Sequence, residues 1–140
     1  MKYFDHYWVD DPMDELSEAE ARGRPSHAEL VDVPVRHFRV FLDRELQHVV
    51  YPDSAPGESV TKLHATQYGN APLWIVSPVV RDDAGKHYDI WYYDGPSVPP
   101  ARTHYDVGER TVETIYDQTG QLTVTRERRY NDARDQIEVI

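Results

Sequence analysis

The sequence contains no cysteine. Disulfide bridges, thiolate metal sites and cysteine nucleophiles are therefore excluded together, and the stability of the fold must come from packing. Long hydrophobic runs are also absent, because no stretch approaches the roughly 20 apolar residues that span a bilayer. Residues 1–6 lack the apolar core of a signal peptide. A cytoplasmic protein with no membrane partner is the expectation.

Positive charge is scarce in this chain. Fifteen Lys and Arg residues stand against 25 Asp and Glu residues, which gives a formal net charge of −10. Such a charge repels phosphate backbones and anionic lipids, so no nucleic-acid partner is expected. The charge suits a basic protein partner, although a well-solvated surface is the more ordinary explanation.

The glycine motifs of common enzymes are missing as well. There is no G-x-S-x-G, G-x-G-x-x-G or G-x-x-x-x-G-K pattern, so a serine-hydrolase elbow and phosphate-binding loops are not predicted. What the chain does contain is aromatic residues, with 3 Trp, 10 Tyr and 3 Phe among 140 residues. This length fits a single domain over residues 1–140, and no cofactor is predicted.

The N-terminal part offers one helix signal. Residues 2–9 alternate aromatic and polar side chains and are predicted to form a first strand. Asp11 then suits an N-cap, Pro12 the first helical position and Gly23 a stop. A helix over residues 13–22 is predicted, and its thin apolar stripe places it on the surface.

From residue 29 onward, period-two alternation with turn residues predicts strands. Hairpins are expected from 36–43 with 46–51 and from 73–80 with 87–94, and further strands at 59–68, 102–107, 111–116, 121–130 and 136–140. Short strands at spacings of about 8–12 residues argue against a β-α-β protein. The predicted fold is mainly β: an antiparallel β-barrel or a strongly bent meander sheet, with one short N-terminal surface helix.

The first predicted hairpin places a histidine on an apolar face. If residues 43–45 form its loop, Phe38, Val40 and Leu42 face Val50, His48 and Leu46. A buried imidazole needs a hydrogen-bond partner or a task. His48 is therefore either a satisfied core histidine or a catalytic base.

One hairpin has a known counterpart. Residues 116–123, YDQTGQLT, resemble the tyrosine–aspartate hairpin unit of Rhs-type repeat proteins and of small antitoxin-like bacterial proteins built from such hairpins. Asp117 is expected to cap the turn and Gly120 to take a positive φ, while Tyr116 and Leu122 pair across the strands. The resemblance implies a meander of hairpins and a binding role, and it transfers no functional residue.

A His-Tyr-Asp triplet occurs twice, at residues 87–89 and 104–106. Residues two apart in a strand share a face about 6–7 Å apart, so each triplet places an imidazole beside a carboxylate. Such a dyad suits a general base. The same face continues from His87 and Asp89 to Trp91 and Tyr93. This stripe either lines a pocket or faces solvent. If it faces solvent, Tyr88, Ile90 and Tyr92 point to the core.

The candidate site residues follow from these patterns. The catalytic candidates are His87, Asp89, Tyr93, Tyr105 and His48, and the ligand-binding candidates are Trp91, Tyr93, Trp74, His104 and Asp106. A two-histidine, one-carboxylate iron site would use His87, Asp89 and His104, but a single H-x-D spacing is a weak signal and no metal is predicted.

Two functions remain open at this point. The first is a non-catalytic binding protein, antitoxin-like or immunity-like, whose acidic surface rich in Tyr and Trp meets a basic partner. The second is a small barrel enzyme, a lyase, isomerase or cyclase, acting on an aromatic or polyene-like molecule in the barrel interior. A homodimer is compatible with either function.

Overall fold

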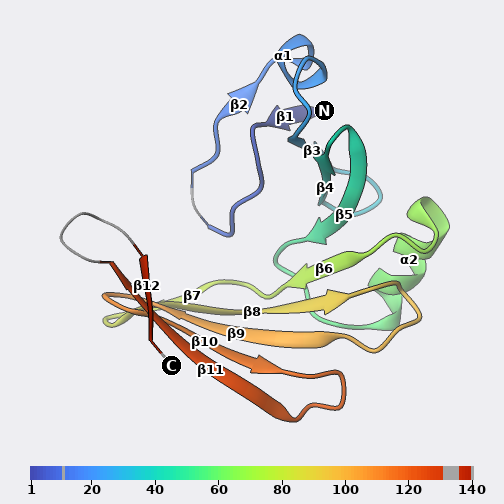
Figure 1. Ribbon diagram of the computed structural model, residues 1–140. Helices are drawn as coiled ribbons and strands as arrows, with labels where there is room; N and C mark the ends of the chain where they lie inside the picture. The colour runs from blue at the N-terminus through green and yellow to red at the C-terminus, as the bar shows by residue number, and fades with distance from the viewer. Residues whose placement is uncertain (11, 131–135, 140) are drawn as a thin grey trace.

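The computed structural model describes residues 1–10, 12–130 and 136–139, which form one 12-stranded sheet with two helices (Figure 1). The elements are β1 (Lys2–Phe4), β2 (Glu15–Leu16), α1 (Glu18–Arg22), β3 (His27–Val31), β4 (His37–Leu42), β5 (Glu45–Tyr51), α2 (Glu58–Tyr68), β6 (Leu73–Val76), β7 (Val80–Asp82), β8 (Gly85–Tyr93), β9 (Ala101–Val107), β10 (Thr111–Tyr116), β11 (Leu122–Tyr130) and β12 (Gln136–Val139). None of the helices in this part of the chain is long and apolar enough to cross a membrane.

The strands run in the order β12-β11-β10-β9-β8-β6-β5-β4-β3-β1-β2, with β7 paired to β8. The predicted mainly β class is confirmed. Over the described residues the sheet does not close on itself, so the predicted barrel does not form there. Figure 1 shows β1–β5 in one half and β6–β11 in the other.

One strand pair is parallel, and α2 joins its two strands. β5 and β6 pair in parallel through Val49 with Leu73 and Val50 with Trp74. A parallel pair needs a crossover connection, which α2 supplies. The predicted strand over residues 59–68 is therefore wrong. Val60, His64 and Tyr68 are spaced by four and lie on the side of α2 that meets the sheet.

The N-terminal helix is shorter than predicted. α1 has Ser17 as its N-cap, and Ser17 and Glu20 form a capping box, which fixes the start of the helix five residues after residue 13. Glu15 and Leu16 instead form β2 beside β1. The predicted stop at Gly23 is confirmed, whereas Asp11 lies outside the described residues. The first strand ends at Phe4 rather than at residue 9.

The β4–β5 hairpin follows most of its predicted register. Phe38 pairs with Val50 and Val40 with His48, as expected. A bulge after Val40 then shifts the ladder, so Leu42 lies opposite Glu45 rather than Leu46. The turn consists of Asp43 and Arg44, which both have a positive φ.

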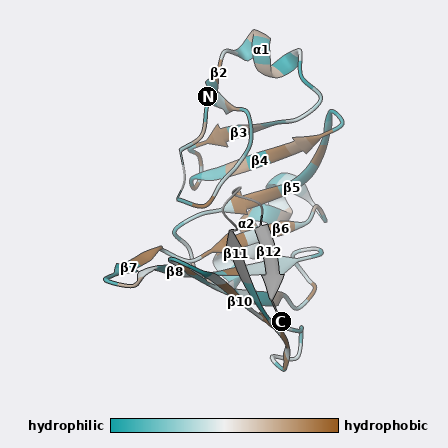
Figure 2. Ribbon diagram, turned by 60° about the vertical axis from the view of Figure 1, so that its left-hand side comes forward, coloured by the Kyte–Doolittle hydropathy of each residue, from teal (hydrophilic) through white to brown (hydrophobic). Residues whose placement is uncertain are grey.

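The sheet is packed on both faces. The face that carries α2, called the α2 face, buries the cluster Val49, Tyr51, Leu73, Ile75 and Tyr93. The opposite face, called the loop face, buries Leu30, Phe38, Val50, Val76 and Ile90, and side chains from the N-terminal segment at residues 4–13 pack over it. Figure 2 shows more hydrophilic residues in β8–β10 than in β3–β5, which agrees with thinner cover over the C-terminal strands.

The C-terminal hairpins agree with the sequence analysis. The β10–β11 turn has the expected chemistry, because Asp117 accepts hydrogen bonds from the backbone of Thr119 and Gln121 and Gly120 has φ +87°. Tyr116 pairs with Leu122 across the strands. The predicted strand over residues 73–80 is divided into β6 and β7, with Pro78 in the gap between them.

Gly85 provides a test of this arrangement. Its φ is +138°, and an added Cβ would overlap the backbone carbonyl oxygen of Val107. Gly85→Ala is expected to lower the free energy of unfolding by about 3 kcal/mol or more, as urea denaturation would measure. Gly57→Ala is the control, because its φ is extended and nothing lies within 4 Å of the added carbon. Equal stability losses in the two variants would contradict the close approach of Gly85 in β8 to the backbone of Val107 in β9.

Candidate functional site

The sheet sorts the predicted site residues onto its two faces. Residues directly opposite each other on neighbouring strands share a face, as do alternate residues along one strand. The α2 face carries His87, Asp89, Trp91, Tyr93, His104 and Asp106. The loop face carries His48, Trp74 and Tyr105. The predicted residues therefore do not form one site.

The stripe along β8 has a buried half and an open half. Tyr93 is 7% exposed and packs with Trp91 in the cluster beneath α2. The His87 side chain, beyond that cluster, is 37% exposed and the Asp89 side chain 24%. The intervening residues Tyr88, Ile90 and Tyr92 belong to the core of the loop face. The stripe thus lines no enclosed cavity in the described structure.

His104 makes the imidazole–carboxylate contact expected within its own triplet, with Asp106 along β9, and a second contact with Asp89 across the strands. His104 Nδ1 lies 3.0 Å from Asp89 Oδ1, and its Nε2 lies 3.2 Å from Asp106 Oδ1. Directly opposed residues lie closer than residues two apart in a strand, which favours the His104–Asp89 pair over a His87–Asp89 pair. His87 Nδ1 instead lies 3.7 Å from Asp82 Oδ2.

This geometry limits the chemistry of His104. Each of its ring nitrogens faces a carboxylate oxygen, so neither is left free to take a proton from a substrate. Tyr93, a predicted donor, is buried beneath α2 and lies six residues along the strand from His87, about 20 Å away. The predicted catalytic set is therefore spread along the strand and across both faces.

The residues of the hypothetical iron site do not converge on one point. The rings of His87 and His104 are 6.2 Å apart, and His87 is directed toward Asp82. Among the residues with described positions, no group of three or more His, Asp or Glu side chains is arranged to hold a metal ion.

His48 occupies a buried aromatic cluster on the loop face. It is 8% exposed, and its ring stacks on Trp74 with centroids 4.0 Å apart. Trp74 in turn meets the edge of Tyr92, whose hydroxyl lies 2.6 Å from that of Tyr105. Burial lowers the pKa of His48 to about 4 and raises the pKa of Tyr92. His48 is therefore a neutral core residue at pH 7.

Two further histidines are buried between α2 and the sheet, and their role was not predicted from the sequence. His64 belongs to α2, and His37 is the first residue of β4. His64 Nε2 donates to the carbonyl of Ala71 at 2.7 Å, and its Nδ1 lies 2.8 Å from the Tyr51 hydroxyl. His37 makes an equivalent pair of contacts, with the carbonyl of Val35 at 2.7 Å and the Tyr68 hydroxyl at 2.5 Å. Burial lowers the pKa of both imidazoles. These bonds tie α2 to β4 and β5.

A groove at one end of the α2 face was also missed. It is lined by Trp91, Pro100, Arg102, Tyr116 and the β10–β11 turn, with a volume of about 390 Å³. The Arg102 guanidinium lies 4.2 Å from the centre of the Tyr116 ring. The groove could have been predicted from the pairing register of the strands, because Arg102 lies opposite Trp91 on one side and opposite Tyr116 on the other.

An acidic hollow lies at the other end of the same face. It has a volume of about 190 Å³ and is lined in part by Asp82, His87, Asp106, Glu109 and Arg110. The groove, the His104 contacts and this hollow follow one another along strands β8–β10. They lie on the part of the α2 face that α2 leaves open. We call this part the open face.

No protein-family model, curated protein or solved structure matches the chain. The open face is therefore interpreted from its own residues.

The buried imidazoles predict a loss of stability in acid. The pKa of His48 in the folded protein lies below its unfolded value of about 6.5, so the unfolded chain binds protons first as the pH falls. The stabilisation from neutral His48 is complete above about pH 6.5 and is lost as the pH falls toward about 4. Between pH 7 and pH 5 the loss in the free energy of unfolding is about 2 kcal/mol.

The measurement is urea unfolding at the two pH values for the protein and for His48→Phe, which keeps a ring against Trp74. The variant is expected to lose about 2 kcal/mol less on acidification. Parallel pH profiles for the two proteins would show that His48 is not the acid-sensitive group.

Proposed function

We propose that the protein is a non-catalytic binding protein, antitoxin-like or immunity-like, which docks a basic protein partner on its open face. The observation that carries the proposal is the row Trp91, Arg102 and Tyr116 across three strands, next to a group of carboxylates on the same face. Trp, Tyr and Arg are the residues that most often dominate binding energy at protein interfaces.

The aromatic end supplies the anchoring part of the surface. The Arg102 guanidinium lies over the Tyr116 ring, which holds this planar group in place before a partner arrives. The groove of about 390 Å³ beside it admits a side chain from a partner. Because these residues lie on paired strands, little conformational entropy is lost when they are covered.

The acidic end supplies the charge preference. Asp82 and Glu109 are exposed in the hollow that His87 lines, and Asp106 and Asp89 flank His104. Two cations lie beside them. Arg110 lies 2.7 Å from Glu127, and Lys86 lies 3.7 Å from Asp10, which it shares with Arg81. With a chain charge of −10, this end favours the approach of a basic surface and repels an acidic one.

The hairpin resemblance supports the same proposal. The β10–β11 hairpin that resembles antitoxin-like proteins forms one wall of the aromatic groove, through Tyr116 and Asp117. We do not extend the proposal to catalysis, because the enzyme hypothesis needed the β8 stripe to face a closed interior. A small aromatic ligand in the groove is the second use that its lining would permit, and the titration below distinguishes it.

The test is a titration of the isotope-labelled protein with a lysine-rich peptide that contains one tryptophan, followed by NMR. We expect shifts at the Trp91 indole and at the amides of β8–β10, and weaker binding as salt rises from about 0.05 to 0.5 M. Asp82→Asn with Asp106→Asn is expected to lower the affinity about tenfold, because two attractive charges are removed while the shape is kept.

The matched control is Asp14→Asn with Asp32→Asn, which removes the same charge from exposed positions elsewhere. An equal loss of affinity in this control would mean that the peptide responds only to net charge, and the proposal would fail. Binding of free indole at the same residues, with no response to the lysine-rich peptide, would favour a small-molecule groove instead.

A further inference from the structure

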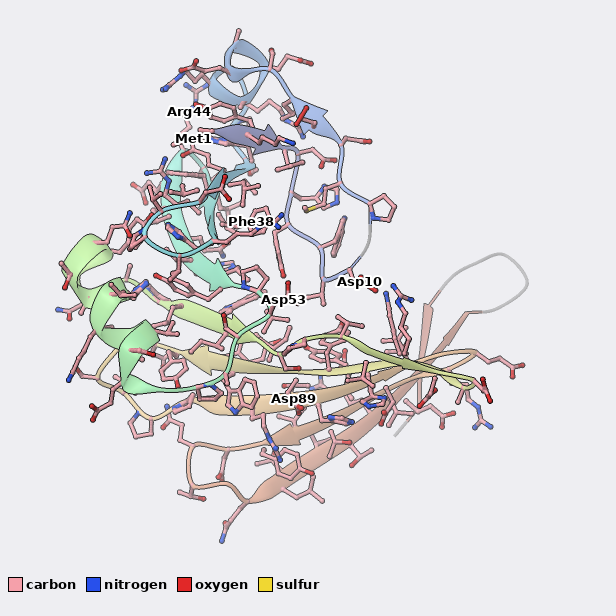
Figure 3. All side chains as sticks on the ribbon, turned by 180° about the vertical axis from the view of Figure 1, so that it is seen from behind. Met1, Asp10, Phe38, Arg44, Asp53 and Asp89 are labelled. Atoms are coloured by element: carbon pink, nitrogen blue, oxygen red, sulfur yellow. The ribbon has the colours of Figure 1, made fainter. Side chains whose placement is uncertain are left out.

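A separate pocket lies where the end of α1 meets the turn between β4 and β5. Its volume is about 320 Å³, and its lining includes Arg22, Arg24, His27, Glu29, Phe41 and Arg44. Figure 3 shows Arg44 close to α1, well away from Asp89 on the open face. This pocket, called the arginine pocket, therefore concerns a different part of the molecule from the proposed docking surface.

The backbone around the arginine pocket is held by hydrogen bonds. The amide of Arg44 donates to the carbonyl of Pro25 at 2.8 Å, which joins the β4–β5 turn to the segment after α1. The amide of Arg24 donates to the carbonyl of Ala21 at 3.2 Å. The guanidinium groups of Arg24 and Arg44 are thus carried on two segments that are tied together.

The floor of the arginine pocket contains one carboxylate, and its charge is already balanced. Glu29 accepts from Arg39 at 2.5 Å and from His27 Nε2 at 2.9 Å. Its side chain is 12% exposed. Because Glu29 has two cationic or N–H partners, it does not offset the arginines at the rim.

His27 adds an unsatisfied polar atom to the same floor. Its side chain is 10% exposed, and its ring stacks on Phe41 with centroids 4.9 Å apart and planes at 10°. Nε2 is committed to Glu29, whereas Nδ1 is buried with no hydrogen-bond partner among the described residues. The stacked rings of His27 and Phe41 give the floor a flat aromatic surface.

Three arginines, Arg22, Arg24 and Arg44, line the rim of the arginine pocket, and Arg24 lies within electrostatic reach of Glu20. Arg22 is paired with Glu18 at 2.8 Å, an exposed contact of the kind that contributes about 0–1 kcal/mol and is readily exchanged. Glu20 is engaged in the capping box with Ser17. Where side chains are described, Arg24 and Arg44 form no ion pair. A chain with a charge of −10 therefore keeps three arginines around one hollow.

We propose that the arginine pocket binds a phosphate monoester, carried either by a small molecule or by a phosphorylated residue of a partner. Arginine pairs with phosphate through two parallel hydrogen bonds. A phosphate monoester brings a charge of about −1.5 to −2 and three acceptor oxygens, which match several guanidinium groups better than a single carboxylate does. Phe41 provides an apolar wall for the group that carries the phosphate.

The test titrates the full-length labelled protein with phenyl phosphate, with benzoate and with a short phosphoserine peptide, and follows the backbone amides by NMR. Phenyl phosphate is expected to bind with a Kd of about 1 mM or below and to shift the amides of Arg24, His27 and Arg44. Benzoate is expected to bind at least about tenfold more weakly. Tighter binding of phenyl phosphate would indicate a small-molecule phosphate, and tighter binding of the phosphoserine peptide would indicate a phosphorylated partner.

Two variants and one control complete the experiment. Arg44→Asn keeps a residue that tolerates the positive φ of the turn, and Arg24→Gln keeps an unbranched polar side chain. Each is expected to weaken phenyl phosphate binding about tenfold. Arg36→Gln removes the same charge from an exposed position outside the pocket and is expected to leave binding within about twofold.

Three results would overturn the phosphate site: no saturable shift, equal binding of benzoate and phenyl phosphate, or an equal effect of Arg36→Gln. The Asp82→Asn and Asp106→Asn pair is expected to leave phosphate binding unchanged. The phosphate site and the docking surface can therefore fail independently of each other.

Discussion

The parallel contact between β5 and β6 is the constraint on which the remaining structure depends. It joins a half built from β1–β5 to a half built from β6–β11, and α2 makes it possible by crossing between the two strands. Two imidazoles hold α2 in place, His64 through Tyr51 and His37 through Tyr68. Each neutral ring both donates and accepts a hydrogen bond, so the helix is fixed by directional contacts as well as by apolar packing.

The pairing of strands then decides which residues act together. His87 and Asp89 share a face, yet Asp89 meets His104 because the opposite strand brings that residue closer. The same alignment produces the row of Trp91, Arg102 and Tyr116, whose members come from three strands. The function proposed for the open face is therefore a property of the register between strands, not of any single segment.

Local patterns predicted much of the fold, and non-local contacts account for most of the errors. The β4–β5 and β10–β11 hairpins were predictable because their turns and paired strands are adjacent in sequence. The β-branched residues within 58–68 favour a strand, whereas Val60, His64 and Tyr68 have the spacing of four that is typical of a helix. The parallel pairing of β5 with β6, which needs a crossover connection, decides for the helix. The capping box at Ser17 was a local signal that marks the start of α1 more reliably than Asp11 and Pro12. The division of site residues between faces required the register across several strands.

The edge of the sheet at β2 has a consequence for solubility. β2 contains two residues, Glu15 and Leu16, and it is followed at once by the capped start of α1. An edge this short, with the charged side chains of Asp14 and Glu15 on or beside it, offers almost no ladder of free backbone groups to another chain. At that edge the protein is protected against strand-to-strand aggregation, even though its sheet is left open.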